Sequence, residues 1–410
     1  MGSAEVRKVR DDEFDAWCDA IDVGFHSPSE RGAGPIRRQW MEMDRCWGAF
    51  ADGKPVGTYR GLALDLTVPG GAAVPVDGIS AVTVLASHRR QGLLSRMMGA
   101  ELTAAKARGE SMAVLIAAEW PIYGRYGFGA ATESADYTLD ARAAQFAVEL
   151  PGTVELVDRA TARAEAPAVY DRYHSQTPGC VSRDGARWDL ALKILRREGE
   201  DEPKDELYAL CRDENGAAVG FVRYKFGAET WTNQRPDMKI KVSDLFATDV
   251  RYEARLWKFL ADHDWATEVY TEWLGPVDPL WRELLVNRRA AWPRGLWEGL
   301  WLRVLDPAAA LSARTYETTG RIVLRITDKD GYADGTFGLE SGLAGAKCTA
   351  TGEAPDVTIP VAVLSSIYLG GFTADRYDQL GLIEEHTAGA AALLSSLFRT
   401  TRSPLNVTGF

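Results

Sequence analysis

The stretch from Ile79 to Ala104 combines a strand, a basic glycine-bearing loop and a helix, and it constrains the fold more than any other part of the sequence. It begins with the β-favouring residues 82–84. After Arg89-Arg90-Gln91-Gly92 it continues into apolar residues at positions 94, 97, 98 and 102, which share one face of a helix. A helix N-terminus presents unpaired backbone N–H groups and a positive dipole end to an anion. The arginines add charge, and glycine lets the backbone approach closely. The stretch therefore predicts a phosphate cradle, although it matches neither G-x-x-x-x-G-K-[ST] nor G-x-G-x-x-G.

At 410 residues the chain is too long for one compact domain, and two or three are expected. In the first part, residues 14–25 have helical spacing and residues 46–68 carry strands with hairpin turns. The cradle strand and helix then precede a short buried strand at 112–117. This order is typical of an α/β (α+β) fold around a mixed sheet. Trp40 and Met43 predict one further short helix in this part.

A composition change near Pro151 marks a second part of the chain. It repeats the order of strand and then helix, at 242–247 and 253–262, but the residues 246–252 contain no glycine. This pattern indicates a degenerate internal repeat of the first part. A third part starts near residue 305 with a helix that Asp306 can cap. The later strands and helices expected in it span 321–327, 337–340, 356–359, 360–369 and 387–397.

A second motif follows the buried strand at 112–117. Residues 118–129 read AEWPIYGRYGFG and contain Tyr-x-x-x-Gly-Phe. The loop Arg89-x-x-Gly92 resembles the pyrophosphate loop of the GNAT acetyltransferases, which bind acetyl-CoA, and Tyr-x-x-x-Gly-Phe resembles the second motif of that superfamily. Leu94 stands where the superfamily pattern has a small residue. The two motifs nevertheless occur in the order, and on the elements, that the superfamily uses.

Nearly the whole chain resembles one group within this superfamily, the Eis (enhanced intracellular survival) acetyltransferases. The segments that carry the resemblance are residues 88–94, 122–125 and 299–303 and the C-terminal Phe410. Leucine at position 94 is usual in this group. The resemblance implies tandem GNAT-like domains around mixed central sheets, plus a C-terminal sterol-carrier-protein-like α+β domain. The expected limits are 1–150 for the catalytic GNAT domain, 151–304 for the degenerate GNAT-like domain and 305–410 for the C-terminal domain.

Acetyl transfer from a thioester to an amine needs a deprotonated amine, a stabilised oxyanion and a proton for the departing thiolate. We expect the cradle strand to pair with the pantetheine amides and the loop to hold the pyrophosphate. The end of the next strand would flank the pantetheine. The predicted acetyl-CoA residues are Val82, Thr83, Val84, Arg89, Arg90, Gln91, Gly92, Leu93, Leu94, Ser95, Ala118 and Glu119.

Tyr123 is the predicted general acid, because a phenol with a pKa of about 10 can donate a proton at neutral pH. Tyr126 is the alternative in the same segment. The superfamily's acid stands four residues before the glycine of Gly-Phe, and that position is Tyr123. The resemblance implies that the general base is the chain's own terminal carboxylate at Phe410, and the apolar tail at 405–410 suits docking. Gly409 stands where the family often has an acidic residue.

The same resemblance places His26 and Trp40 in the amine pocket, and Ala81, at a position that can be aromatic in relatives, makes that pocket roomier. The resemblance implies an acetyl-CoA-dependent N-acetyltransferase that works as a homohexamer. Its acceptors would be primary amines of cationic substrates such as aminoglycosides, at one or several positions, or lysine side chains. The alternative is a carrier of lipid or other hydrophobic ligands without transferase activity. The tryptophan-rich residues 273–301 and the C-terminal domain suggest it.

The net charge of −11 argues against a nucleic-acid or anionic-membrane partner and is compatible with a cationic amine. The sequence has no signal-peptide core and no apolar run of membrane-spanning length. Its five cysteines are odd in number and lack C-x-x-C spacing, which predicts a reduced, cytoplasmic protein. The five histidines form no metal-type cluster, so no metal is expected.

Overall fold

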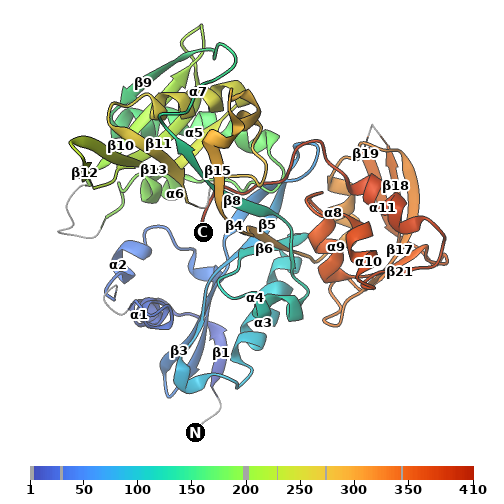
Figure 1. The fold of residues 1–410 in the computed structure, drawn as a ribbon. Coiled ribbons are helices and arrows are strands. Elements are labelled where there is room, and N and C mark those ends of the chain that lie inside the picture. The colour runs from blue at the N-terminus through green and yellow to red at the C-terminus, as the bar shows by residue number, and fades with distance from the viewer. Residues whose placement is uncertain (1–3, 28–30, 197–202, 229, 273–274, 343–344) are drawn as a thin grey trace.

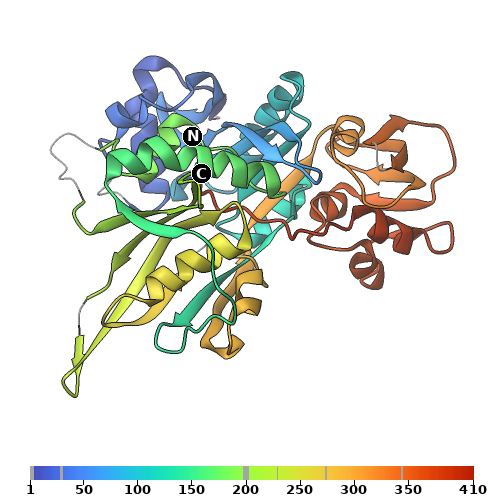
Figure 2. The same cartoon turned by 90° about the horizontal axis from the view of Figure 1, so that it is seen from above.

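The computed structural model describes residues 4–27, 31–196, 203–228, 230–272, 275–342 and 345–410. These residues form three β-sheets, and Figures 1 and 2 show them as three lobes that meet near the middle of the molecule. The mixed α/β architecture expected from the sequence is confirmed. Within the described ranges, none of the helices has the length and apolar character needed to cross a membrane.

The first sheet carries the cradle strand at its centre. β5 and β6 are parallel, whereas the other neighbouring strands are antiparallel. Helices α1 (Phe14–Gly24) and α3 (Leu93–Ala107) lie on either side of this sheet (Figure 1). Their positions confirm the helices expected from the apolar spacing. The strand order is β1 (Glu5–Lys8), β2 (Cys46–Ala51), β3 (Lys54–Arg60), β5 (Ala73–Val84), β6 (Met112–Ile116), β16 (Leu300–Val304) and β7 (Gly129–Ala130), with β4 (Ala63–Thr67) paired to β5.

The second sheet repeats the plan of the first, with a parallel pair between β13 and β14. Helices α5 (Arg159–Gln176), α6 (Gly185–Ala191) and α7 (Val250–Ala261) pack beside it. The order of its strands is β15 (Ala291–Glu298), β8 (Glu133–Asp140), β14 (Ala266–Thr271), β13 (Arg235–Ala247), β11 (Ala218–Phe226), β10 (Glu206–Arg212) and β9 (Thr153–Val157), with β12 (Thr230–Thr232) paired to β13.

The first two sheets exchange strands. β8 precedes residue 150 but pairs with β14 and β15 in the second sheet. β16 falls within the limits expected for the second domain, 151–304, but lies between β6 and β7 in the first sheet. All five residues of β16 are buried, and Arg303 in this strand forms a fully buried ion pair of 2.7 Å with Asp328. Sheet membership therefore crosses the limit expected between the first and second domains.

The third sheet has the order β19 (Gly345–Ala350), β18 (Gly335–Gly342), β17 (Gly320–Thr327), β20 (Val357–Pro360) and β21 (Glu384–Glu385). Its helices are α8 (Pro307–Ala313), α9 (Val361–Ile367), α10 (Ala374–Gln379) and α11 (Ala390–Phe398). Asp306 caps α8 by accepting a hydrogen bond from the Ala309 N–H, as its position before a proline suggests. From this lobe the chain returns to the junction of the other two, where it ends (Figures 1 and 2).

The helix expected around Trp40 and Met43 is wrong. The helix of this segment is α2, which spans Gly34–Arg37, and a 3-10 turn occupies Met43–Arg45. Pro35 lies in the first turn of α2, where its fixed backbone angle favours a helix start. Of the tryptophans of the centre, Trp281 and Trp301 are buried in two different cores and Trp292 is exposed, whereas Trp273 lies outside the described residues.

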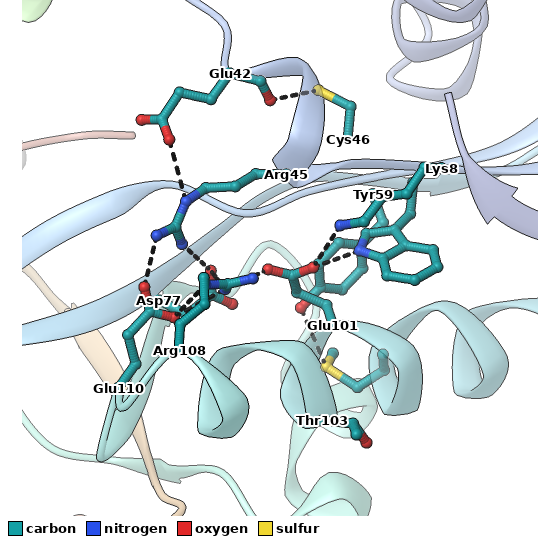
Figure 3. A network of polar contacts seen from close by, with 12 residues as sticks. Lys8, Glu42, Arg45, Cys46, Tyr59, Asp77, Glu101, Thr103, Arg108 and Glu110 are labelled. Carbon is teal, nitrogen blue, oxygen red and sulfur yellow. Dashed lines mark hydrogen bonds and ion pairs between the residues drawn. The ribbon is translucent and has the colours of Figure 1, made fainter. Parts of the chain in front are cut away.

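A network of buried ion pairs lies beside β5 (Figure 3). Arg45 contacts Glu110 at 2.6 Å and Asp77 of β5 at 3.3 Å. Arg108 contacts Glu101 at 2.7 Å and Glu110 at 2.8 Å. The Asp77 and Glu101 carboxylates are fully buried. This network joins the central strand to α3 and to the loop that precedes β2.

Candidate active site

Parallel strands β5 and β6 separate toward their carboxyl ends. Their pairing covers only Asp77, Gly78 and Ile79 of β5, so residues 80–84 have no partner on the β6 side. A cavity of about 900 Å³ opens there. A strand edge with free N–H and C=O groups can pair with the amides of an extended ligand. The cavity therefore has the volume, and on one wall the free strand edge, that a pantetheine-like chain needs.

Most of the predicted acetyl-CoA residues line this cavity. They are Val82, Thr83, Val84, Arg89, Arg90, Gly92, Leu93, Leu94, Ser95, Ala118 and Glu119. Gln91 is the exception, because it belongs to the loop but not to the cavity wall. The cradle and the end of β6, which is more distant in the sequence, thus face the same cavity. Ile116 and Ala117 also line it.

The cradle loop has the backbone form that an anion site needs. Gly92 is the N-cap of α3 with φ of 72°, and Arg90 also has a positive φ, of 64°. No side chain caps the N-terminus of α3. The N–H groups of its first turn therefore have no acceptor from a capping side chain and are available to a pyrophosphate.

We call the first sheet with α1 and α3 the first unit, and the second sheet with α5, α6 and α7 the second unit. In the second unit, the position equivalent to the cradle is closed to an anion. There Asp249 caps α7, and its carboxylate accepts a hydrogen bond from the Arg251 N–H at 2.8 Å. A carboxylate at a helix N-terminus takes the place that a phosphate would need and repels a second anion. Since 248–252 also lack glycine, the second unit has the fold of the first without its cradle.

Tyr123 and Tyr126 both line the large cavity, but their hydroxyls differ. The Tyr126 hydroxyl is hydrogen-bonded to the Ser95 Oγ at 2.9 Å. The Tyr123 hydroxyl has no hydrogen-bond partner among the described residues. Burial, with Glu119 and Tyr126 nearby, raises the pKa of Tyr123 to about 12, so this phenol holds its proton at neutral pH. Of the two, Tyr123 has the hydroxyl that no described residue engages.

The chain end is held between the first two units. Leu405 and Val407 are buried in the core around Tyr170 and Phe246 of the second unit. The Leu405 N–H donates to the Pro178 carbonyl at 2.9 Å. The tail therefore docks as an ordered segment rather than fraying.

Arg183 fixes Val407 and Thr408, the two residues that precede Gly409. Its Nη2 donates to the Val407 carbonyl at 2.9 Å and its Nε to the Thr408 Oγ1 at 2.8 Å. Asp244 pairs with the same guanidinium at 2.5 Å, and the Tyr170 hydroxyl contacts Thr408 Oγ1 at 2.5 Å. Burial disfavours the charge of Arg183, but Asp244 outweighs that effect and raises its pKa, so the arginine stays charged. These contacts leave Phe410 packed against the core of the first sheet.

A second cavity, of about 590 Å³, adjoins the first. Both cavities are lined by Ser80, Ala81, Gly409 and Phe410, so they meet at the chain end. Ala81 has φ of 51°, and the register of β5 against β3 shifts at this point, which is a β-bulge. The bulge opens the strand where the two cavities meet.

The two residues predicted for the amine pocket lie apart. Trp40 lines the second cavity, whereas His26 is exposed and lines the first. Sequence reasoning missed the arginines of the second cavity, which come from the first and second units: Arg37, Arg60, Arg183, Arg187 and Arg223. No local motif marks them, because they converge only through tertiary folding. Among the described residues, no group of His, Cys, Asp and Glu has the composition to hold a metal ion.

Comparisons with known proteins agree with this geometry. Residues 5–131 and 179–326 each match a family described as an acetyltransferase (GNAT) domain, and residues 307–406 match a sterol carrier protein domain. An uncharacterized N-acetyltransferase of Streptomyces avermitilis is 39% identical over 98% of this chain and 97% of its own length. The N-acetyltransferase Eis of Mycobacterium tuberculosis is 35% identical over 80% of this chain and 79% of its own length.

Solved structures show the same three-part fold. Eis1 from Mycobacterium abscessus superposes with a TM-score of 0.85 at 28% identity, covering 99% of this chain and 100% of that protein. A GCN5-related N-acetyltransferase from Anabaena variabilis has the same fold, with a TM-score of 0.84 at 18% identity over 99% of this chain and 100% of its own. The chain therefore belongs to the Eis family of GNAT N-acetyltransferases.

Proposed function

We propose that this chain transfers the acetyl group of acetyl-CoA to a primary amine, with Tyr123 as general acid and the terminal carboxylate of Phe410 as general base. The observation that carries the proposal is the position of Phe410, which lines both cavities. The first cavity has the cradle and the strand edge that a CoA thioester needs. The second offers separate space for an acceptor. The chain end lies where the two substrates would meet.

The protons have defined routes in this arrangement. A carboxylate only accepts hydrogen bonds, so the chain end can take a proton from the attacking amine. The amine nitrogen forms a bond to the thioester carbonyl carbon, and the carbon–sulfur bond breaks. The Tyr123 hydroxyl, which holds its proton because its pKa is about 12, protonates the departing sulfur. Holding both substrates beside these two groups would supply much of the acceleration.

The acceptor classes that the family resemblance suggests are aminoglycosides, at one or several amines, and lysine side chains. By the same resemblance we expect a homohexamer in the cytoplasm, which light scattering and fractionation would test. The alternative of a lipid carrier would place its ligand in the C-terminal domain. The two adjoining cavities instead combine residues of the first and second units with the chain end.

A thiol-release assay tests the proposed function. Purified protein is incubated with acetyl-CoA and a panel of aminoglycosides, polyamines, lysine peptides and amino acids, and mass spectrometry identifies the acetylated product. We expect thiol release that depends on the amine and a product heavier by one or more acetyl groups. Binding of acetyl-CoA without transfer to any amine, together with co-purified lipid, would instead support the carrier.

A further inference from the structure

Arg60 is a buried cation without an ion-pair partner among the described residues. It ends β3, lines the second cavity and is 6% exposed. Its Nε has no hydrogen-bond acceptor, and the guanidinium forms no ion pair with any described residue. Burial lowers the pKa of Arg60 to about 10, which still leaves it charged at neutral pH. A buried cation is costly without a counter-charge, so this site is incomplete in the protein alone.

Trp40 adds a second unsatisfied donor beside the first. The Arg60 guanidinium lies over the Trp40 ring at 4.4 Å, and Trp40 also lines the second cavity. Its indole Nε1 is buried and has no acceptor. Indole and guanidinium groups only donate hydrogen bonds. Two adjacent donors without acceptors match a ligand group that only accepts, and a planar guanidinium fits a carboxylate or a phosphate.

The other charged side chains of the second cavity are already neutralised. Each of its remaining arginines and each of its acidic residues belongs to an ion pair. The pairs are Arg37–Asp22, Arg183–Asp244, Arg187–Asp184, Arg223–Glu206 and Lys241–Glu272. Only two charges among the described lining residues have no ion-pair partner: the Arg60 cation and the terminal carboxylate of Phe410. The acidic groups of the wall are therefore not free to attract a polycation.

We propose that the acceptor is a primary amine that carries an anionic group, a carboxylate or a phosphate, in the same molecule. Arg60 and Trp40 bind the anion, while the amine faces the carboxylate of Phe410. This inference rests on the proposed transferase function but departs from the aminoglycoside acceptors that the family resemblance suggests. It favours amino acids and related aminated acids over polycationic amines, which would leave Arg60 unpaired.

Matched amines of one chain length test the proposal. The probes are 6-aminohexanoate, 1-aminohexane and 1,6-diaminohexane, which differ only in the group at the far end. We expect kcat/KM for 6-aminohexanoate to exceed that for either other amine by about tenfold or more, since a charged hydrogen bond contributes that much. 6-Aminohexyl phosphate distinguishes a preference for phosphate from one for carboxylate. A higher kcat/KM for 1,6-diaminohexane would overturn the proposal.

Substitution of Arg60 should remove this selectivity through KM. In Arg60→Gln we expect the KM for 6-aminohexanoate to rise about 10- to 100-fold, because the charge-assisted contact is lost, with the kcat/KM ratio to 1-aminohexane approaching one. Arg60→Lys keeps the charge without the planar fork and should restore part of the preference. Arg142→Gln is the control, since Arg142 is an exposed arginine that donates to the Pro236 carbonyl and lies outside this cavity. Its selectivity should remain. Unchanged selectivity in Arg60→Gln would contradict the assignment.

A binding measurement separates this inference from the function itself. Hexanoate has the anion but no amine, so it can occupy the Arg60 site without reacting. We expect hexanoate, but not 1-hexanol, to raise the melting temperature of wild type and to have no such effect on Arg60→Gln. Hexanoate binding without turnover of any amine would refute the transferase and keep the anion site. Amine turnover with neither hexanoate binding nor selectivity would refute the anion site and keep the transferase function.

Discussion

The guanidinium of Arg183 donates to the hydroxyl of Thr408 at 2.8 Å, and this contact joins the second unit to the chain end. Arg183 also holds the Val407 carbonyl, so two adjacent residues of the tail are fixed immediately before Gly409. The second unit has lost the cradle, because Asp249 caps its helix. Its contribution to the site is different: it supplies the anchor that positions the tail and one wall of the second cavity.

Thr408→Val should lower kcat with little effect on the KM for acetyl-CoA. The substitution removes the Oγ1 that contacts Arg183 and Tyr170, so the terminal carboxylate is held less firmly. We expect kcat to fall about tenfold, the equivalent of one hydrogen bond to a charged group. Steady-state kinetics of thiol release measure the effect. Thr408→Ser keeps the hydroxyl and should remain near wild type, and a Thr408→Val variant as fast as wild type would exclude a positioning role for this contact.

Removal or displacement of the terminal carboxylate should nearly abolish turnover. Deletion of Phe410, or one glycine added after it, moves the carboxylate away from the junction of the two cavities. We expect a loss of about a hundredfold or more in kcat, the usual contribution of a general base, with acetyl-CoA affinity largely intact. Single-turnover kinetics and calorimetric titration measure the two quantities. Phe410→Leu keeps the carboxylate and serves as the control; it should retain most of the activity that the deletion loses.

Tyr123→Phe should reduce kcat much more than Tyr126→Phe. The two variants lose the same atom from the same cavity, but the Tyr126 hydroxyl is engaged by Ser95 and the Tyr123 hydroxyl is not. We expect a loss of about a hundredfold for Tyr123→Phe, as for removal of a general acid, and only a small change for Tyr126→Phe. Rates measured with acyl-CoA analogues that have better leaving groups should recover in Tyr123→Phe. Equal losses in both variants would argue that neither hydroxyl is the proton donor.

The elements of the site that sequence could locate are those coded locally. The cradle at 89–95 and Tyr123 are short runs with a fixed relation to one strand and one helix, so their spacing alone brings them to one cavity. Only the family resemblance predicts a role for Phe410, since apolar residues at a chain end do not by themselves show where the end docks.

The rest of the site depends on contacts between distant segments. Arg60 becomes an unpaired cation only because its neighbours pair elsewhere, and Arg183 becomes the tail anchor across 225 positions of sequence. The place of β16 in the first sheet cannot be predicted for a similar reason. Its sequence is that of any buried strand, and only its packing between β6 and β7 reveals the exchange.

The pH dependence of kcat should show no loss of activity on the alkaline side up to about pH 11. Tyr123 must be protonated to act as an acid, and its pKa of about 12 keeps it so across this range. An ordinary phenol, with a pKa of about 10, would lose its proton near pH 10 and impose a descending limb there. Stopped-flow measurements of single turnovers, made within the time for which the protein stays folded, give the profile. A descending limb near pH 10 that is absent in Tyr123→Phe would show that burial does not hold this proton.

Asp77→Asn should leave the fold intact at pH 8, whereas Arg45→Met should destabilise it by about 3–5 kcal/mol. The Asp77 Oδ2 has no donor, and burial together with Glu101 and Glu110 raises the pKa of Asp77 well above its usual range (Figure 3). The amide keeps the shape and leaves Glu101 and Glu110 to balance Arg45 and Arg108. Loss of Arg45 instead removes the cation that contacts the buried Glu110 carboxylate and the Asp77 carboxyl.

The pH dependence of the stability difference between wild type and Asp77→Asn tests whether Asp77 holds its proton in the folded protein. A carboxyl whose folded pKa lies above its unfolded value of about 3.9 stabilises the fold fully below that value and loses this contribution as pH rises through the folded pKa. The free energy of unfolding of wild type relative to Asp77→Asn should therefore fall between pH 4 and pH 8. Urea denaturation at several pH values measures it. If the free energy of unfolding of wild type relative to Asp77→Asn instead rises with pH, Asp77 is ionised in the folded protein and is stabilised by Arg45 and Arg108. The network would then consist of paired charges and would not hold a proton on Asp77.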